Sequence, residues 1–219
     1  MDKIITLSPN WDERTRPIDM VLLHYTDMKS AQKAMDCLKN PLSRVSCHYV
    51  IDEEGQVYRL VQEEKRAWHA GESFWQGQTD LNSSSIGIEL VNPGHSCGYT
   101  PFPDSQIEAL IVLLSEIQSR WKISPSRILG HSDVAPRRKQ DPGHLFPWKY
   151  LHQKGFGLWP VEGKEAYGDV KEGLCKIGYE TISLPHTLMA FQRHFRPYKI
   201  DGIADKETLT LIDGLINDC

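Results

Sequence analysis

The sequence predicts an α/β fold followed by a small helical C-terminal domain. Strand patterns alternate with helical patterns over the first two thirds of the chain, and the composition then changes to a glycine-rich stretch around Pro160. A length of 219 residues exceeds one typical domain but falls short of two large ones. We therefore expect a main domain at residues 1–158, a linker at 159–168 and a three-helix domain at 169–219.

Two of the predicted strands carry a polar residue whose position is informative. Residues 20–23 form a continuously apolar run that ends at His24, as in a buried strand with a polar tip. Residues 85–91 alternate apolar side chains with glycine and glutamate. This alternation places Glu89 on the face opposite the apolar residues, because successive strand residues point to opposite sides.

A third strand leads into an irregular segment. Residues 128–129 form a short apolar run that ends just before Gly130 and His131. Three prolines follow between His131 and Trp148, and we expect this stretch to form a shaped loop without regular structure. Residues 48–61 predict a β-hairpin, because a glycine-bearing turn separates two β-rich runs.

The helical predictions follow from apolar spacing and capping residues. Residues 105–120 repeat apolar side chains at three- and four-residue intervals behind cap residues, which predicts an amphipathic helix. Residues 30–38 have similar spacing and stop before an Asn-Pro pair. Helical patterns at about 169–179, 184–195 and 205–216 make up the C-terminal domain.

Composition excludes several classes of partner. The 25 basic and 29 acidic residues give a formal charge of −4, which offers no basic surface for nucleic acid or an anionic membrane. No stretch approaches the ~20 apolar residues of a membrane span. The first residues lack the apolar core of a signal peptide, so we expect no leader in this sequence. The expected location is the cytoplasm, or the periplasm or cell envelope if a leader was removed. We also expect a monomer.

The cysteines identify neither a disulfide framework nor a zinc finger. They are odd in number and contain no CxxC pair: Cys37, Cys47, Cys97, Cys175 and Cys219. Their redox state stays open at this point.

Three potential metal ligands lie where predicted strands end. His24 and His131 each follow a strand, and Asp141 lies in the loop behind the second. Two neutral imidazoles and one carboxylate leave a fourth tetrahedral position for water, which is the arrangement of a catalytic zinc site. Zinc lowers the pKa of such a water towards ~7 and generates a nucleophile at neutral pH.

Two further residues have the chemistry to assist such a site. Glu89 would accept the proton of the water and pass it to a leaving amine. Lys139, two residues before Asp141, would place a positive charge against the oxyanion of a tetrahedral intermediate. Each residue alone also has an ordinary structural explanation, as a hydrogen-bonded histidine, a surface carboxylate or part of a solvated basic turn.

Three motifs resemble those of a known family. Residues 67–71 (AWHAG), 85–90 (SIGIEL) and 130–143 (GHSDVAPRRKQDPG) are similar to the type-2 N-acetylmuramoyl-L-alanine amidases of the AmpD and AmiD kind. Peptidoglycan recognition proteins share their fold. The resemblance covers about residues 15–150 and implies a mixed central β-sheet surrounded by helices.

The resemblance also implies an activity and a site. The expected reaction is hydrolysis of the amide bond between the lactyl group and L-alanine in peptidoglycan or muropeptides, during cell-wall degradation or recycling. The matching positions imply zinc on the three ligands named above, with Glu89 and Lys139 as catalytic partners. Trp68 and His69 are expected in the substrate cleft, and His48 as a further substrate contact.

One departure from the family pattern and one further resemblance, in the C-terminal part of the chain, add to this expectation. Cys47 lies where phage relatives carry a tyrosine thought to act in catalysis, which leaves Glu89 as the better candidate. Residues 187–197 and 200–209 resemble the helical peptidoglycan-binding domain of many wall hydrolases. If this domain only targets the wall, truncation near Gly168 should leave hydrolysis of soluble muropeptides almost unchanged.

Alternatives from other classes remain open from the sequence alone. His131 and Asp133 form an HxD pair, which with His144 or His152 would make the facial triad of a non-haem iron oxygenase. A non-catalytic peptidoglycan recognition protein is the second alternative. The preference between anhydro-muramic and intact wall substrates is also open, because the added C-terminal domain favours polymer and the missing leader favours cytosolic fragments.

Overall fold

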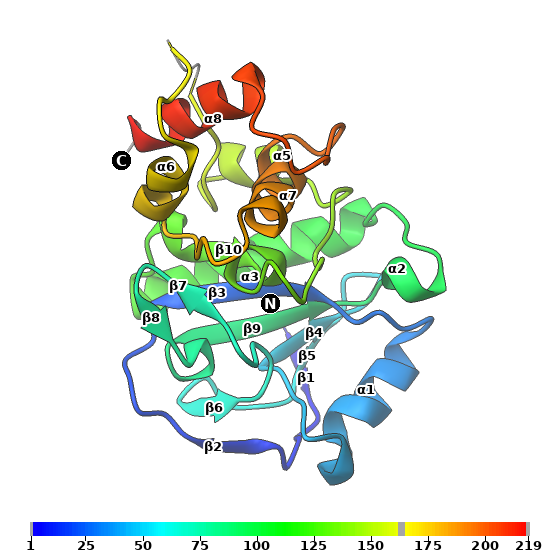
Figure 1. Cartoon of the computed structure of the whole chain (residues 1–219). Coiled ribbons are helices and arrows are strands. Elements are labelled where there is room, and N and C mark those ends of the chain that lie inside the picture. Colours follow the sequence, from blue (N-terminus) through cyan, green and yellow to red (C-terminus); the bar gives the residue numbers. More distant parts are fainter. Residues whose placement is uncertain (1, 162–164, 218–219) are drawn as a thin grey trace.

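The computed structural model describes residues 2–161 and 165–217 and confirms the predicted α/β fold. A six-stranded sheet in the order β1-β5-β4-β9-β3-β10 forms its centre, with helices packed around it (Figure 1). The strands of this sheet are β1 (Lys3–Ile5), β3 (Met20–Tyr25), β4 (Tyr49–Ile51), β5 (Val57–Arg59), β9 (Ser85–Leu90) and β10 (Ile128–Gly130). No helix in the described part of the chain is long and apolar enough to cross a membrane.

The sheet is mixed, and its parallel strands bring distant parts of the chain to one edge. Strand β3 pairs in parallel with β9 on one side and with β10 on the other. The predicted hairpin of β4 and β5 is antiparallel, and β4 joins β9 in parallel. In this register His24 lies beside Glu89, and Gly130 lies beside Leu23. The ends of β3 and β10 therefore deliver His24 and His131 to the same place.

Alternate residues of β3 belong to two different cores. Val21 and Leu23 pack in a cluster with helix α3 (Asp104–Trp121). Met20 and Leu22 pack in a second cluster that includes the C-terminal helices. Because successive strand residues alternate, His24 points to the side of Met20 and Leu22. The side of the sheet that carries His24 is thus the side that the C-terminal helices cover in part.

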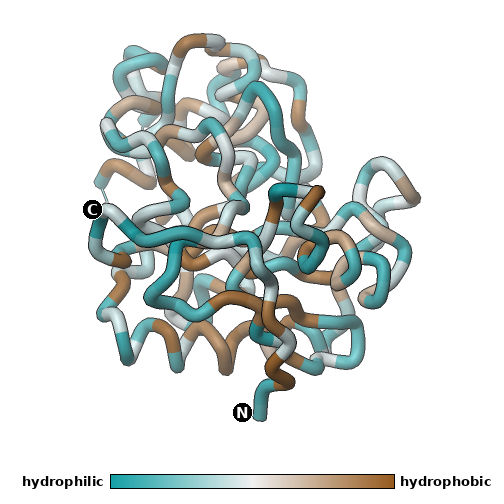
Figure 2. Tube along the Cα trace, turned by 90° about the horizontal axis from the view of Figure 1, so that it is seen from below, coloured by the Kyte–Doolittle hydropathy of each residue, from teal (hydrophilic) through white to brown (hydrophobic). Residues whose placement is uncertain are grey.

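Helices complete the main body as the sequence predicted, with end points shifted by one or two residues. Helix α3 buries one face that includes Leu110, Leu114 and Ile117. Helix α1 (Ala31–Lys39) begins behind the capping side chain of Ser30 and packs near β4 and β5. A short helix α2 (Gly94–Cys97) follows β9. Near the N-terminus, where Figure 2 shows a hydrophobic stretch of trace, Ile4 and Ile5 are exposed.

The three C-terminal helices lie together and share a core with the sheet. They are α6 (Val170–Ile177), α7 (Leu184–Phe195) and α8 (Lys206–Ile216), coloured yellow to red in Figure 1. Leu174, Phe191 and Leu215 belong to the same buried cluster as Met20 and Leu22. The predicted linker at 159–168 contains residues 162–164, which lie outside the described residues. The three helices do not have a core separate from that of the main body.

The segment after β10 differs from its prediction. We expected no regular structure from His131 to Trp148, but helix α4 (His131–Val134) opens the segment and helix α5 (Trp148–Gln153) begins at its end. The first proline stands only at residue 136, so nothing prevents one helical turn before it. The Asp133 carboxylate accepts from the Gly130 N–H at 2.8 Å and caps this turn.

Short elements that the sequence reasoning did not identify line the side of the main sheet. They form two small antiparallel ribbons, β2 (Trp11–Glu13) with β6 (Lys65–Ala67) and β7 (Phe74–Trp75) with β8 (Gln78–Thr79). Single 3₁₀ turns lie at Pro41–Ser43, Leu81–Ser83 and Pro125–Arg127. These strands are two or three residues long, too short to show a periodic pattern.

Candidate active site

Three donor atoms converge at the ends of β3 and β10. The Nδ1 atoms of His24 and His131 are 2.9 Å apart, and each lies 3.0 Å from Oδ2 of Asp141. All three side chains are buried. Tetrahedral zinc bonds of about 2.0–2.2 Å would separate neighbouring ligand atoms by roughly 3.3–3.5 Å, close to this triangle. The spacing therefore fits one small cation with three protein ligands.

The outer hydrogen bonds of the two histidines fix which atoms face the centre. Nε2 of His131 lies 2.9 Å from the carbonyl oxygen of Ala70, which only accepts, so this nitrogen carries the proton. The Nδ1 lone pair of a neutral His131 then points at Nδ1 of His24 and at the Asp141 carboxylate. Several acceptors meeting at one point is the donor set that a cation requires. The chemistry of the residues thus fits a metal.

Burial and neighbouring side chains keep His24 and Asp141 in the protonation states that a metal needs. Burial and the neighbouring His131 lower the pKa of His24 to about 4. Burial opposes the ionisation of Asp141, but its contacts with His131 and His24 outweigh this effect and hold the pKa of Asp141 below its usual range. At neutral pH the site therefore presents a neutral His24 and an ionised Asp141.

His69 packs directly behind the first ligand. Its Nδ1 lies 3.0 Å from Nε2 of His24, and its Nε2 lies 3.4 Å from Oγ of Ser85. A Cβ atom added to Gly87 would come within 2.4 Å of the His69 ring, so only glycine leaves room for the imidazole. If His24 held a metal through Nδ1, its Nε2–H would donate to Nδ1 of His69. His69 thus orients a ligand, a contact that the sequence reasoning did not foresee.

Glu89 and Lys139 lie in the wall of a cleft that contains the three ligand candidates. The cleft has a volume of about 330 Å³. The Oε2 atom of Glu89 is buried without a hydrogen-bond partner. Burial and the negative charge of Asp141 raise the pKa of Glu89 well above its usual range, and Lys139 partly opposes this shift. A carboxylate with a raised pKa and a free oxygen is suited to accept and return a proton.

Trp68 and His69 line the same cleft, as expected for substrate contacts. The Trp68 indole is half-buried, and its Nε1–H donates to Asp12 at 3.2 Å. The backbone N–H groups of His69 and Ala70 both donate to Oδ1 of Asn82, which holds this turn in place. The side chain of Trp68 therefore borders the cleft from a fixed backbone.

His48 is not where a substrate could reach it, contrary to the sequence expectation. Its side chain is fully buried and does not line the cleft. Nδ1 accepts from the Gly87 N–H at 2.9 Å, and Nε2 lies 3.0 Å from the carbonyl oxygen of Lys65. Burial and the nearby Arg14 lower the pKa of His48 to about 3. His48 is a neutral structural residue that ties β4 to its neighbours.

The structure also removes the iron-oxygenase alternative. Asp133 does not point at His131; its carboxylate oxygens bond to Gly130, His194 and Tyr179 instead. Among the described residues, the only cluster of three or more potential ligands is His24, His131 and Asp141. Neither His144 nor His152 belongs to it.

A group of rim residues escaped the sequence reasoning. The Tyr25 hydroxyl lies 2.8 Å from Nδ1 of His95, whose ring stacks on Tyr99 at 4.5 Å. His95 and Ser96 line the cleft, and Ser96 donates to Asp27 through its backbone N–H and its hydroxyl. The available signal was weak: Tyr25 and Asp27 lie next to His24 in sequence, but nothing marked residues 95–99.

Fold and site together define a mixed α/β scaffold with a candidate metal centre of the kind that hydrolases use. Residues 14–144 match the family described as N-acetylmuramoyl-L-alanine amidase, and the chain belongs to this family. It is 37% identical to the N-acetylmuramoyl-L-alanine amidase AmiD of Escherichia coli, across 91% of this chain and 82% of that protein. It is 36% identical to the 1,6-anhydro-N-acetylmuramyl-L-alanine amidase AmpD of Haemophilus influenzae, across 66% and 88%.

Solved structures agree with this assignment over nearly the whole chain. The Escherichia coli AmiD structure, a complex with anhydro-N-acetylmuramic acid-L-Ala-D-γ-Glu-L-Lys, has a TM-score of 0.84 at 34% identity, covering 94% of this chain and 92% of that one. AmpDH3 of Pseudomonas aeruginosa in complex with anhydromuramic pentapeptide has a TM-score of 0.84 at 31% identity, covering 97% and 98%. Both matches include the C-terminal helices, and the chain is an amidase of this family.

Proposed function

We propose that this amidase is zinc-dependent and hydrolyses the amide bond between the lactyl group of muramic acid and the first L-alanine of the stem peptide. The observation that carries the proposal is the triangle of His24 Nδ1, His131 Nδ1 and Asp141 Oδ2 at the floor of the cleft. Two nitrogens and one oxygen with an open side are typical of catalytic zinc. The substrates named for AmiD and AmpDH3 support a muropeptide in the cleft.

The proposed roles follow from the placement of the residues. Bound zinc would lower the pKa of a coordinated water and polarise the scissile carbonyl. Glu89 accepts the proton of the attacking water at its unpartnered Oε2 and returns it to the leaving alanine nitrogen. Lys139 faces the developing oxyanion with its positive charge. Trp68 borders the bound sugar and peptide from the cleft wall.

We further propose that the C-terminal helices contact peptidoglycan while remaining part of the enzyme body. Their resemblance to a wall-binding domain is supported by exposed apolar side chains, of which Tyr198 and Ile203 lie in the turn between α7 and α8. The double variant Tyr198→Ser/Ile203→Ser should reduce co-sedimentation with insoluble wall and leave hydrolysis of soluble muropeptide unchanged. Undiminished co-sedimentation would contradict the proposal.

The test of the zinc proposal compares two proteins on one defined substrate. Metal-free wild type, prepared with a chelator, should regain release of free stem peptide when one equivalent of zinc is added, measured by mass spectrometry. Asp141→Ala should bind zinc weakly and release no peptide. A metal-free protein that cleaves at the full rate, or an Asp141→Ala variant with full zinc occupancy by elemental analysis, would overturn the assignment.

A further inference from the structure

The buried carboxylate of Asp133 connects helix α4 to the C-terminal part of the chain. Helix α4 begins with the metal-ligand candidate His131. Asp133 Oδ2 accepts from the Gly130 N–H at 2.8 Å and lies 2.8 Å from Nδ1 of His194 in α7. Its Oδ1 accepts from the Tyr179 hydroxyl, also at 2.8 Å. Asp133 and His194 are both buried, so water does not compete for these bonds.

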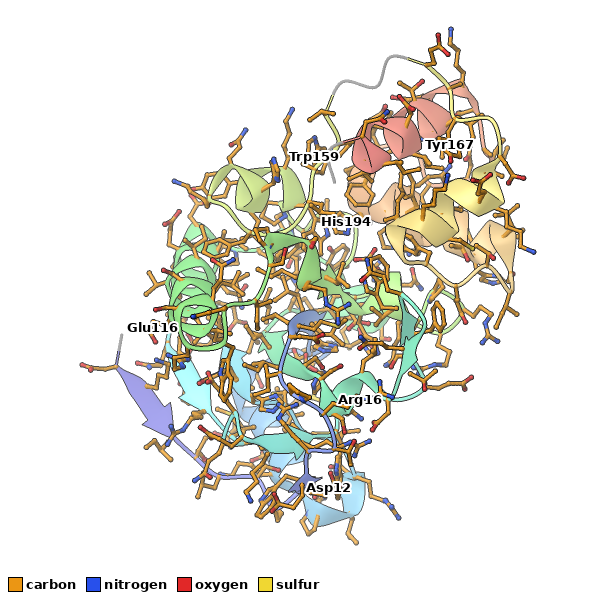
Figure 3. All side chains as sticks on the ribbon, turned by 90° about the vertical axis from the view of Figure 1, so that its left-hand side faces the viewer. Asp12, Arg16, Glu116, Trp159, Tyr167 and His194 are labelled. Atoms are coloured by element: carbon orange, nitrogen blue, oxygen red, sulfur yellow. The ribbon has the colours of Figure 1, made fainter. Side chains whose placement is uncertain are left out.

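His194 occupies a closely fitted position at this junction. Its ring stacks on Trp148 of helix α5 with centroids 3.9 Å apart and planes 16° apart. Figure 3 shows His194 where the C-terminal helices meet the main body. The other ring nitrogen, Nε2, is buried without a partner. The Nδ1 contact to Asp133 is thus the polar contact that this imidazole makes, and it sets the ring orientation.

The same turn links the two ligand-bearing segments. The backbone N–H of Ser132 donates to the carbonyl oxygen of Asp141 at 2.8 Å. A Cβ atom on Gly130 would meet Pro142 at 2.7 Å and both Asp133 and Trp148 at 3.2 Å. The backbone at Gly130, between β10 and α4, is therefore packed tightly against Pro142, the neighbour of Asp141. A change in the position of Asp133 would therefore change the positions of both His131 and Asp141.

From these contacts we infer that His194 and Tyr179 are positioning residues for the metal site: they fix Asp133, which fixes the turn that aims His131 and anchors Asp141. The C-terminal helices then contribute to the geometry of the reaction centre, beyond any contact with the wall. The inference rests on the proposed metal site. Partners of metal ligands beyond the first contact typically change metal affinity or activity by 10–100-fold when removed.

Variants at residue 194 separate the hydrogen bond from the packing. His194→Phe keeps a ring against Trp148 but has no donor for Asp133, whereas His194→Asn keeps an N–H near the position of Nδ1. Tyr179→Phe removes only the hydroxyl that bonds Oδ1 of Asp133. Gln192→Leu is the matched control on the same helix, because Gln192 bonds Asp201 and Ile203 rather than the main body.

Three measurements on the full-length protein test the inference. His194→Phe and Tyr179→Phe should weaken zinc binding about tenfold in a chelator competition well below the unfolding temperature, and His194→Asn should restore part of it. The absorption bands of the cobalt-loaded protein should shift in the same order, because they report ligand geometry. Hydrogen exchange of the metal-free protein should accelerate at the amides of residues 131–135.

The control variant and the measurement on the metal-free protein distinguish failure of this inference from failure of the proposed function. Gln192→Leu should lower the unfolding temperature yet leave zinc affinity, the cobalt spectrum and the α4 amides as in wild type. A His194→Phe variant with wild-type affinity and exchange, or a Gln192→Leu variant equally impaired, would overturn the inference. If wild type bound no zinc, the proposed function would fail by itself, and the exchange of residues 131–135 would still decide whether His194 holds the turn.

Discussion

The imidazole of His69 lies so close to the backbone of Gly87 that a Cβ atom at residue 87 would stand 2.4 Å from its Cγ. His69 in turn contacts Nε2 of His24. Gly87→Ala should therefore push His69 off His24 and weaken metal binding, by about 10–100-fold for a lost outer partner. Chelator competition measures the change.

The control for this substitution is Gly168→Ala, since a Cβ atom at Gly168 meets no atom within 4 Å. It should leave metal affinity unchanged. His69→Ala should reproduce the loss seen for Gly87→Ala, because both remove the contact to His24. Wild-type affinity in Gly87→Ala would show that His69 can move without disturbing the ligand.

Glu89→Gln and Lys139→Ala should retain the metal and the fold, because neither side chain belongs to the ligand triangle. Both should lose rate through kcat more than KM, since proton transfer and oxyanion stabilisation act mainly in the transition state. Loss of general acid–base catalysis typically costs ~10²–10⁴-fold, and loss of one oxyanion partner on the order of 10²–10³-fold. Steady-state kinetics on a soluble muropeptide, with zinc content checked, measures both.

A zinc-replete Glu89→Gln enzyme with near-normal kcat would eliminate Glu89 as the proton carrier. His48 could not replace it, because its side chain is buried away from the cleft. His48→Gln is accordingly the matched comparison: it should lower stability while kcat of the folded fraction stays near that of wild type.

Glu63 links Tyr49 of strand β4 to helix α3 through its carboxylate and should make stability depend on pH. Burial opposes its ionisation, but hydrogen bonds from Arg120, Tyr49 and Trp121 outweigh it and lower the pKa of Glu63. A lowered pKa in the folded state stabilises the protein above the unfolded value of about 4.3, and the contribution disappears as pH falls through the folded value. Glu63→Gln should thus destabilise the protein at neutral pH by about 2 kcal/mol.

The measurement is urea unfolding of the metal-free protein at pH 7 and in acid. The difference between wild type and Glu63→Gln should begin to shrink below about pH 4.3, where Glu63 of the unfolded chain takes up a proton, and should be lost as pH falls through the lower folded-state pKa. Tyr49→Phe removes one neutral donor to Glu63 and should cost less at pH 7. A difference that is constant over this range would mean that charge at Glu63 contributes nothing.

Truncation at Gly168 should unfold more than the C-terminal helices. A pure targeting domain could be removed with little effect, but we expect a large effect here because Phe191 and Leu174 pack in one buried cluster with Met20 and Leu22. Losing a single buried phenylalanine typically costs about 3–5 kcal/mol, and the truncation removes several such residues. Thermal unfolding should show a markedly lower midpoint or an insoluble product; a truncated protein with the wild-type midpoint would restore the targeting interpretation.

The sequence was sufficient for the elements that depend on periodicity. Helix α3 and strands β3 and β9 appeared where apolar spacing predicted them. The structure also brings His24, His131 and Asp141 together, because parallel strands end at a common edge. These predictions succeeded because local pattern and strand direction determine them.

The remaining features depend on packing between distant segments, which periodicity does not report. A histidine at the start of β4 reads the same whether it faces a cleft or the interior, and His48 faces the interior. Asp133 resembled half of an iron site, but its partner is His194, 61 residues further along the chain. No local signal links those two positions.

The parallel pairing of β3 with β10 determines at which stage of folding the candidate metal site could form. The candidate ligands His24, on β3, and His131, directly after β10, are 107 residues apart in the chain, and they meet only after β10 has paired with β3. Closing so long a loop costs conformational entropy, which many contacts formed together must offset. Such topologies are therefore slow to fold. An ion held by both histidines would therefore bind after these strands have paired, and it would stabilise a finished scaffold instead of nucleating one.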